Sequence, residues 1–234
     1  MAHSIKNIRH VFFDLDHTLW DFEKNSSAAI AEIFDDFQLH QYVNSFEKFI
    51  NQYQQINAQY WQRYNKGEID KRMVRYGRFY DLFQLYKIDD HIKKAEMFAD
   101  AYLAIAPAKT HLFPHTHEIL AYLGEKYKLH LISNGFKEVL EIKITRTDLK
   151  KYFDVILSSE DVGVNKPDIR VFHHALNLSQ AEKHESVMIG DSYDADILGA
   201  HNAGMQVIHF NPKGEVFDHN FVQIHSLHDL RRWL

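Results

Sequence analysis

This 234-residue chain contains two kinds of sequence pattern, one typical of helices alone and one typical of alternating strands and helices. The order of these patterns restricts the fold more than any other feature. Between about Asp21 and Ala106 there is no proline, and apolar residues recur at the three- and four-residue spacing of amphipathic helices. Three such stripes are Ile30, Ile33, Phe34 and Phe37; Phe46, Phe49, Ile50 and Tyr53; and Phe79, Leu82, Phe83 and Tyr86. This block therefore predicts a small bundle of helices.

The sequence on either side of this block has a different pattern. All 4 prolines lie at Pro107 or beyond. Short apolar runs that predict strands cover residues 10–13, 129–132, 153–157, 187–189 and 207–208. Helical patterns lie between them, near residues 115–127, 136–150, 168–178 and 194–203. Alternation of strand and helix predicts a mostly parallel sheet covered on both faces. We expect an α/β fold: a Rossmann-like core of residues 1–20 and 107–234, with a helical cap domain, residues 21–106, inserted after the first strand.

Composition and charge narrow the function. The formal net charge of −5 gives no reason to expect binding to nucleic acid, whose phosphates require clustered Lys and Arg. The absence of cysteine excludes disulfides and thiolate chemistry and fits a reducing compartment. No apolar run is long enough to span a membrane. We therefore expect a cytoplasmic protein, a monomer or small homo-oligomer, without nucleic-acid or membrane partners.

Four polar segments come directly after predicted strands or in the loops between them. They are Asp14-Leu15-Asp16-His17-Thr18, Ser133-Asn134-Gly135, Lys166-Pro167, and Gly190-Asp191 with Asp194 and Asp196. Parallel sheets bind ligands at the carboxyl ends of their strands, so we expect these segments to converge there. The alternate-position ligands and terminal Glu of an EF-hand are missing around Asp191, which excludes that kind of calcium loop.

The residue types of these segments suit phosphoryl transfer. Several carboxylates brought together are costly to ionise without a cation, and Mg²⁺ prefers carboxylate, water and phosphate oxygens. Asp14 is the candidate nucleophile, since aspartate can carry a phosphoryl group when a metal assists it. Lys166 would stabilise charge on the transferring group. Asp16, two residues after Asp14, is placed to protonate the leaving oxygen and later to deprotonate water.

Other residues are candidates for holding the substrate. Ser133, the Asn134 amide and the helix that begins after Gly135 would donate hydrogen bonds to phosphate oxygens. Thr18 in the first segment is a further candidate phosphate-binding residue. Trp20, directly after that segment, would line the entrance to the site.

Together, the four segments resemble the signature motifs of the haloacid dehalogenase superfamily, in the same order and over essentially the whole chain. The resemblance implies that Asp14 is the nucleophile and that Asp16 is the acid/base, with its main-chain carbonyl on the metal. It implies Asp191 as a further metal ligand and Asp196 as a supporting acidic side chain beside the metal. Dehalogenases of the superfamily lack the second aspartate, so the presence of Asp16 favours phosphate ester hydrolysis.

A finer resemblance concerns the substrate. Residues 61–67 and 72–79, the stretch 159–167 and the ending 226–230 are similar to the pyrimidine 5′-nucleotidase branch, which acts on nucleoside monophosphates, including noncanonical ones. A phosphoglycolate or sugar-phosphate phosphatase is the alternative within the superfamily. A receiver-like signalling module and an inactive binding protein of the same fold are alternatives from other classes. The long insertion and the intact motifs argue against both.

Several residues of the predicted cap could serve either its packing or the binding of a substrate. Four aromatic residues could stack on a nucleobase, although helical spacing favours packing inside the cap. They are Tyr60, Trp61, Tyr64 and Tyr76. We expect the four nearby arginines to form a solvated face, with contact of one of them to a substrate as the alternative. They are Arg63, Arg72, Arg75 and Arg78.

Overall fold

The computed structural model describes residues 5–217 and 221–234, which divide into two compact units. One unit contains the described residues up to Asp21 and from Thr110 onward, and the other runs from Phe22 to Lys109. We call them the core and the cap. No helix among the described residues is long and apolar enough to cross a bilayer.

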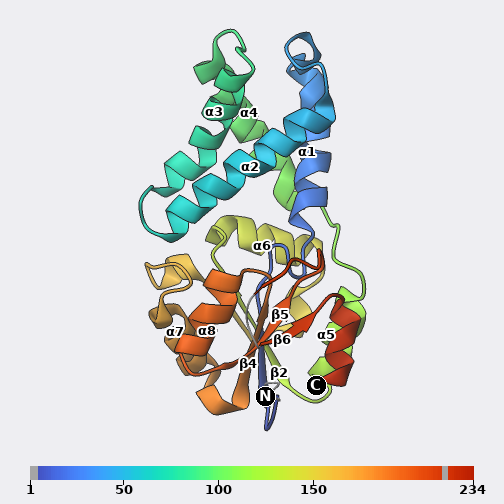
Figure 1. Cartoon of the computed structure of the whole chain (residues 1–234), viewed down its shortest axis with the longest axis vertical. Helices are drawn as coiled ribbons and strands as arrows, with labels where there is room; N and C mark the ends of the chain where they lie inside the picture. The colour runs from blue at the N-terminus through green and yellow to red at the C-terminus, as the bar shows by residue number, and fades with distance from the viewer. Residues whose placement is uncertain (1–4, 218–220) are drawn as a thin grey trace. The chain divides into compact units, whose positions relative to one another are not determined.

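The core is built on a parallel six-stranded sheet with the order β3-β2-β1-β4-β5-β6 (Figure 1). The strands are β1 His10–Phe13, β2 Lys128–Ser133, β3 Val155–Ser158, β4 Ser186–Gly190, β5 Gln206–Phe210 and β6 Val222–Ile224. The order reverses between β1 and β4, which is where sheets of this type bind ligands. Strand β6, only 3 residues long, was too short to predict from its apolar pattern.

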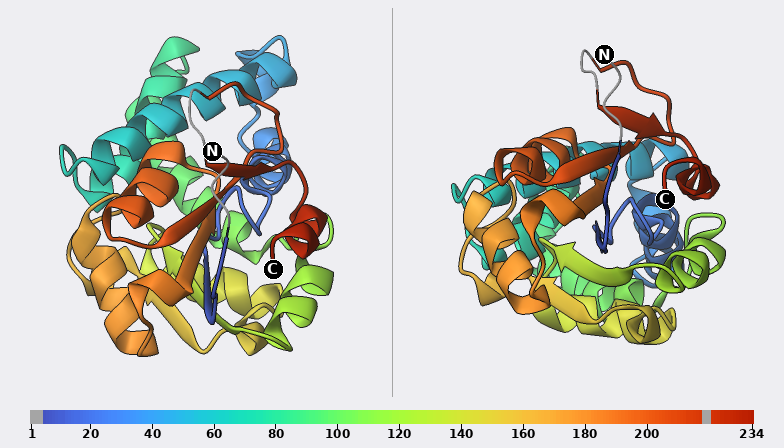
Figure 2. Two further views of the ribbon diagram at one scale, coloured as in Figure 1. Left: turned by 60° about the horizontal axis from the view of Figure 1, so that its bottom comes forward. Right: turned by 90° about the horizontal axis from the view of Figure 1, so that it is seen from below.

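Helices cover both faces of this sheet (Figure 2). They are α5 Thr116–Gly124, α6 Lys137–Arg146, α7 Ile169–Ser179 and α8 Gly199–Asn202, the last preceded by a π-helical segment, Tyr193–Leu198. Phe12 of β1 and Met188 of β4 are fully buried and pack in one cluster with Phe172 of α7. Helix α5 lies on the opposite face. Burial on both faces explains why the strands read as continuous apolar runs.

The chain leaves and re-enters the core at one place. The amide of Asp21 donates to the carbonyl of His111 over 3.1 Å, and the amide of Phe113 donates to the carbonyl of Leu19 over 2.9 Å. The two connecting segments are therefore paired side by side. The whole cap is inserted between β1 and β2 through this single junction.

The cap consists of helices α1 Phe22–Asp36, α2 Phe46–Asn65, α3 Arg78–Leu85 and α4 His91–Ile105, with a π-helical turn at Met73–Gly77 (Figure 1). The predicted stripes meet in its interior, where Ile33, Phe49 and Phe83 are buried. Ser45 begins α2 by accepting a hydrogen bond from the Lys48 amide, a standard N-cap.

Two cap residues illustrate how packing decides between the alternatives. Tyr60 is 6% exposed and donates a 2.8 Å hydrogen bond to Asp81, so it belongs to the interior of the cap. The expectation of a solvated arginine face is wrong for Arg78, which is 3% exposed. Its guanidinium donates to Asn57 and lies 5.0 Å from the ring centre of Phe79 and 5.1 Å from that of Tyr102. Aromatic faces can stabilise a cation in such a position, which the linear pattern of charges does not reveal.

Candidate active site

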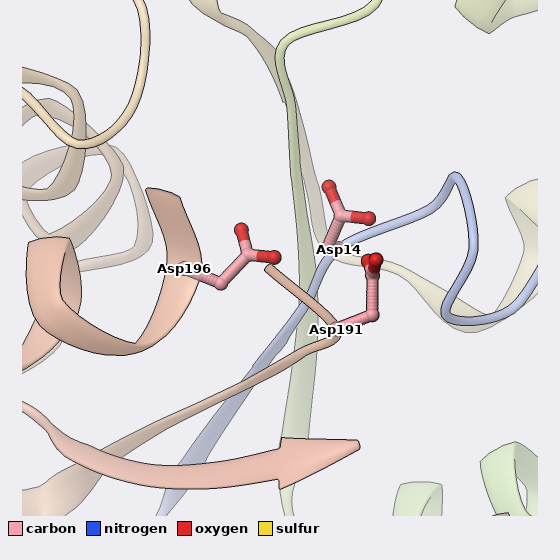
Figure 3. Close-up of side chains that lie close together, drawn as sticks. All are labelled: Asp14, Asp191 and Asp196. Atoms are coloured by element: carbon pink, nitrogen blue, oxygen red, sulfur yellow. The ribbon is translucent and has the colours of Figure 1, made fainter. Parts of the chain in front are cut away.

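The sheet brings distant carboxylates together at its carboxyl edge. Asp14 directly follows β1, and its amide donates a 2.9 Å hydrogen bond to the carbonyl of Ile189 in β4. Asp191 follows β4, and Asp196 lies in the π-helical segment after it. Figure 3 shows the three carboxylates converging from these elements. A carboxylate oxygen from each lies within 4.8 Å of those of the other two.

Burial makes this acidic group unusual. Asp14 is 7% exposed and Asp196 is 1% exposed. Burial raises the pKa of Asp14 to about 7, with Lys166 opposing the shift and Asp196 adding to it. Burial, together with the charge of Asp14, also raises the pKa of Asp191 well above its ordinary value. The site therefore holds more negative charge than a protein interior tolerates without a cation.

Lys166 supplies one positive charge to this group. Its ammonium donates to Asp14 Oδ1 over 2.7 Å, to Asp196 Oδ1 over 2.6 Å and to the carbonyl of Ile132 over 2.9 Å. Burial would lower the pKa of Lys166, but Asp14 and Asp196 outweigh that effect and raise it. Lysine is thus held charged, with its three protons all directed at acceptors.

The oxygen donors fit a hard divalent cation. Of the three carboxylates, Asp14 and Asp196 form ion pairs with Lys166, so the group carries more negative charge than this lysine neutralises. Oxygen-only ligation by one or two carboxylates with water is what Mg²⁺ prefers. Asp196 is engaged by Lys166 and accepts a 3.1 Å hydrogen bond from the Ser192 amide. Asp14 and Asp191 are then the carboxylates best placed to bind the ion, with Asp196 supporting them.

Thr18, which is predicted to bind phosphate, makes hydrogen bonds to Asp191. It is fully buried, and its hydroxyl accepts from the Asp191 amide over 3.0 Å and donates to Asp191 Oδ1 over 3.2 Å. Thr18 therefore orients Asp191. His209 of β5 supports the same loop by donating from Nε2 to the Asp191 carbonyl over 2.9 Å. The sequence alone gave no reason to select His209 from 17 scattered histidines.

Residues of the second segment also make hydrogen bonds within the core. The Asn134 side-chain amide donates to the Lys166 carbonyl over 3.0 Å, and its oxygen accepts from the Lys166 amide over 2.9 Å. The Asn134 side chain therefore positions the Lys166 loop. The Ser133 hydroxyl accepts a 3.0 Å hydrogen bond from the Gly135 amide, which closes a tight turn. A Cβ on Gly135 would lie 3.1 Å from Ser133 Oγ, which is tighter than an ordinary contact, and 3.5 Å from Asp16 Oδ2, which is an ordinary contact distance.

Helix α6 begins just after this turn, where a phosphate was expected to bind. One of its first amides, that of Lys137, already donates to the Glu160 carboxylate over 2.7 Å. Side-chain carboxylates are favourable at a helix N-terminus for the same reason that phosphates are. Glu160 thus accepts a hydrogen bond from one of the helix amides that were predicted to donate to the substrate phosphate.

Asp16 and Trp20 lie beside a lysine that the sequence analysis missed. Lys143 of α6 contacts Asp16 Oδ1, and its ammonium is 4.0 Å from the ring centre of Trp20. Trp20 is 1% exposed, so the position predicted to line an entrance is a buried one. Lys143 occurs among the charged residues of an amphipathic helix, and nothing in that pattern separates it from solvated lysines.

Comparison with known proteins agrees with this geometry. The profile of the haloacid dehalogenase-like hydrolases matches residues 11–210, from β1 to the end of β5. This chain belongs to that family. Its predicted fold class is confirmed by the crystal structure of the HAD-hydrolase YfnB from Bacillus subtilis bound to magnesium, which shares 24% identity. That structure superposes with a TM-score of 0.87 and covers 97% of this chain and 98% of its own.

Two relatives of this chain are named for different activities. The pyrimidine 5′-nucleotidase YjjG from Escherichia coli is 30% identical over 86% of this chain and 85% of its own length. A glyceraldehyde 3-phosphate phosphatase from Methanothermobacter thermautotrophicus is also 30% identical, over 87% of this chain and 86% of its own. The predicted resemblance to the nucleotidase branch is confirmed, and a sugar-phosphate phosphatase is equally similar in identity.

Proposed function

We propose that this hydrolase is a Mg²⁺-dependent phosphatase of small phosphate monoesters that uses Asp14 as a covalent nucleophile. The observation that carries the proposal is the buried Asp14 carboxylate, held at Oδ1 by Lys166 beside Asp191 and Asp196. A carboxylate fixed in this way meets the phosphorus atom in one orientation, which is a large part of its advantage over a free carboxylate. The two relatives described above are named as a 5′-nucleotidase and a phosphatase, which supports the assignment.

The reaction follows from the positions of these side chains. Asp14 forms a bond to phosphorus while the bond from phosphorus to the ester oxygen breaks, and Lys166 stabilises the negative charge that develops. Asp16 donates its proton to the departing oxygen and then takes a proton from the water that hydrolyses the aspartyl phosphate. A Mg²⁺ ion held by Asp14, Asp191 and the main-chain carbonyl of Asp16 would supply neutralisation of the phosphate charge.

Substitution of the nucleophile tests this mechanism. Asp14→Asn keeps the shape of the side chain but cannot form an acyl phosphate, so turnover of p-nitrophenyl phosphate should fall below detection. Asp194→Asn is a matched control, because Asp194 is exposed and lies only two residues from Asp196. The control should turn over at the wild-type rate. Undiminished turnover by a folded Asp14→Asn variant would overturn the assignment.

For the substrate we propose a nucleoside monophosphate, on the resemblance to the nucleotidase branch and the similarity to YjjG. Phosphoglycolate and sugar phosphates are the competing substrates, and the second relative favours the latter. The test compares kcat/KM over a panel of pyrimidine and purine monophosphates, phosphoglycolate and sugar phosphates. A kcat/KM that is highest for a pyrimidine monophosphate supports the proposal, and one that is highest for a sugar phosphate or phosphoglycolate rejects it.

A further inference from the structure

Lys143 is buried where a lysine is costly. Its side chain is 6% exposed, although it lies on α6, a helix whose other basic residue in the last turn, Arg146, is exposed. Moving an ammonium out of water is unfavourable unless a carboxylate or an aromatic face compensates it. Lys143 has both: Asp16 Oδ1 on one side and the Trp20 ring, 4.0 Å away, on another.

The partners of Lys143 belong to one short turn after β1. Asp16 and Trp20 form an isolated bridge, and the His17 amide donates to the Trp20 carbonyl over 2.9 Å. The backbone of Lys143 also has a side-chain partner, because its carbonyl accepts a 2.6 Å hydrogen bond from the Thr147 hydroxyl. A long, flexible side chain is thereby confined between α6 and the turn that carries Asp16.

This arrangement leaves the two oxygens of Asp16 in different surroundings. Oδ1 is engaged by Lys143. Oδ2 faces Gly135, where an added Cβ would lie 3.5 Å from it, and the Asp16 side chain remains 25% exposed. Oδ2 is therefore directed toward the Ser133–Gly135 turn at the carboxyl edge of the sheet.

The site thus contains a lysine for each of its working carboxylates. Lys166 holds Asp14, and Lys143 holds Asp16, although the two lysines come from different segments. We propose that Lys143 is a positioning residue that fixes Asp16 so that Oδ2 transfers the proton to and from the reacting oxygen. This inference rests on the proposed phosphatase function, and in particular on Asp16 as its acid/base.

The proposed effect is confined to proton transfer. When the bond between phosphorus and the ester oxygen breaks, its electron pair stays on that oxygen and the proton on Asp16 Oδ2 moves to it. A rotated Asp16 delivers that proton poorly, and a misplacement of about 1 Å can cost about 100-fold in rate. An alkyl alcohol needs the proton to leave, whereas p-nitrophenolate leaves readily without it. Loss of Lys143 should therefore penalise alkyl phosphates selectively.

The experiment compares kcat/KM for p-nitrophenyl phosphate with kcat/KM for the best alkyl phosphate of the substrate panel. Lys143→Met keeps an unbranched apolar side chain at this position and removes the charge. We expect it to lower kcat/KM for the alkyl phosphate about 10- to 100-fold and that for p-nitrophenyl phosphate by less than about threefold. Lys143→Arg restores a cation and should recover most of the loss.

A control variant accounts for general effects on the helix. Lys150→Met removes a lysine that pairs with Glu141 of α6 and is 59% exposed, and it should leave both substrates unchanged. Circular dichroism and urea unfolding check that each variant is folded. An equal fall for both substrates in folded Lys143→Met, or no fall for either, would overturn the inference.

Asp16→Asn separates this inference from the function on which it rests. If Asp16→Asn loses alkyl phosphate hydrolysis while Lys143→Met does not, the acid/base assignment survives and the role of Lys143 is rejected. If Asp16→Asn leaves the alkyl-to-aryl ratio unchanged, the acid/base assignment itself is rejected. In the Asp16→Asn background, Lys143→Met should cause no further change in that ratio, because the two residues act as one unit.

Discussion

Gly190 at the end of β4 lies so close to the acidic group that adding one methyl group should dismantle it. A Cβ at this position would lie 2.4 Å from both Cγ and Oδ2 of Asp196 and 2.6 Å from its Cβ. Carbon atoms do not approach one another to such distances without repulsion. Since Asp196 is 1% exposed, it has no solvent to move into. The Gly190→Ala variant must therefore displace the Asp196 carboxylate.

The cost can be worked out from what Asp196 holds. It accepts from Lys166 over 2.6 Å and from the Ser192 amide over 3.1 Å. Separating a buried ion pair costs about 3–5 kcal/mol, and Lys166 keeps Asp14 as a partner, so we expect a loss of about 3 kcal/mol in the free energy of unfolding. Because Lys166 also orients Asp14, kcat/KM for p-nitrophenyl phosphate should fall about 100-fold.

Urea unfolding and steady-state kinetics measure both quantities, with Gly124→Ala as the matched control. A Cβ at Gly124, the last residue of α5, would meet Leu129 Cδ1 at 3.8 Å, an ordinary contact. Neither glycine has a positive φ, so the two substitutions differ mainly in the space available. The control should change stability by less than about 1 kcal/mol. If Gly190→Ala behaves like the control, Asp196 is not held as described.

Three further outcomes can be measured. EDTA should abolish hydrolysis and Mg²⁺ should restore it, and Mg²⁺ should raise the Tm, because an ion bound by Asp14 and Asp191 stabilises only the folded state. Burial lowers the pKa of His130 from 6.5 to about 4, so the folded state keeps it neutral. The contribution of neutral His130 to the free energy of unfolding is then fully present above pH 6.5 and is lost toward pH 4, by up to about 3 kcal/mol. Urea unfolding should show that the free energy of unfolding falls less between these pH values in His130→Leu than in the wild type. Gly77→Ala should destabilise the cap by about 1–3 kcal/mol in thermal unfolding, because its Cβ would meet the Tyr60 ring at 2.6 Å; unchanged unfolding would contradict the packing described.

The sequence was informative where function depends on strand ends. The sequence pattern alone predicts that Asp14 and Asp191 lie together, since parallel strands bring their carboxyl ends to one edge. The identity of the neighbouring strands was not available from the pattern, because periodicity says which face a strand buries and not which strand it pairs with.

The contacts of individual side chains were less accessible. Asn134 and Thr18 were assigned to the phosphate from their motifs, but they also hydrogen-bond to the Lys166 and Asp191 segments. Lys143 and Arg78 look like surface charges in sequence, and both are buried against aromatic rings. These contacts depend on the orientation in which elements distant in sequence pack together, and a local sequence pattern does not specify that orientation.

The paired segments at the junction of cap and core have a consequence for how such a protein can vary. Because the amide of Asp21 bonds to His111 and the amide of Phe113 bonds to Leu19, the ends of the insertion are fastened together before the cap begins. The pairing of β1 with β2 lies entirely within the core, on the other side of these hydrogen bonds from the cap. Insertions of unrelated size could be exchanged at this junction while the strands that carry Asp14 and Asp191 stay in place.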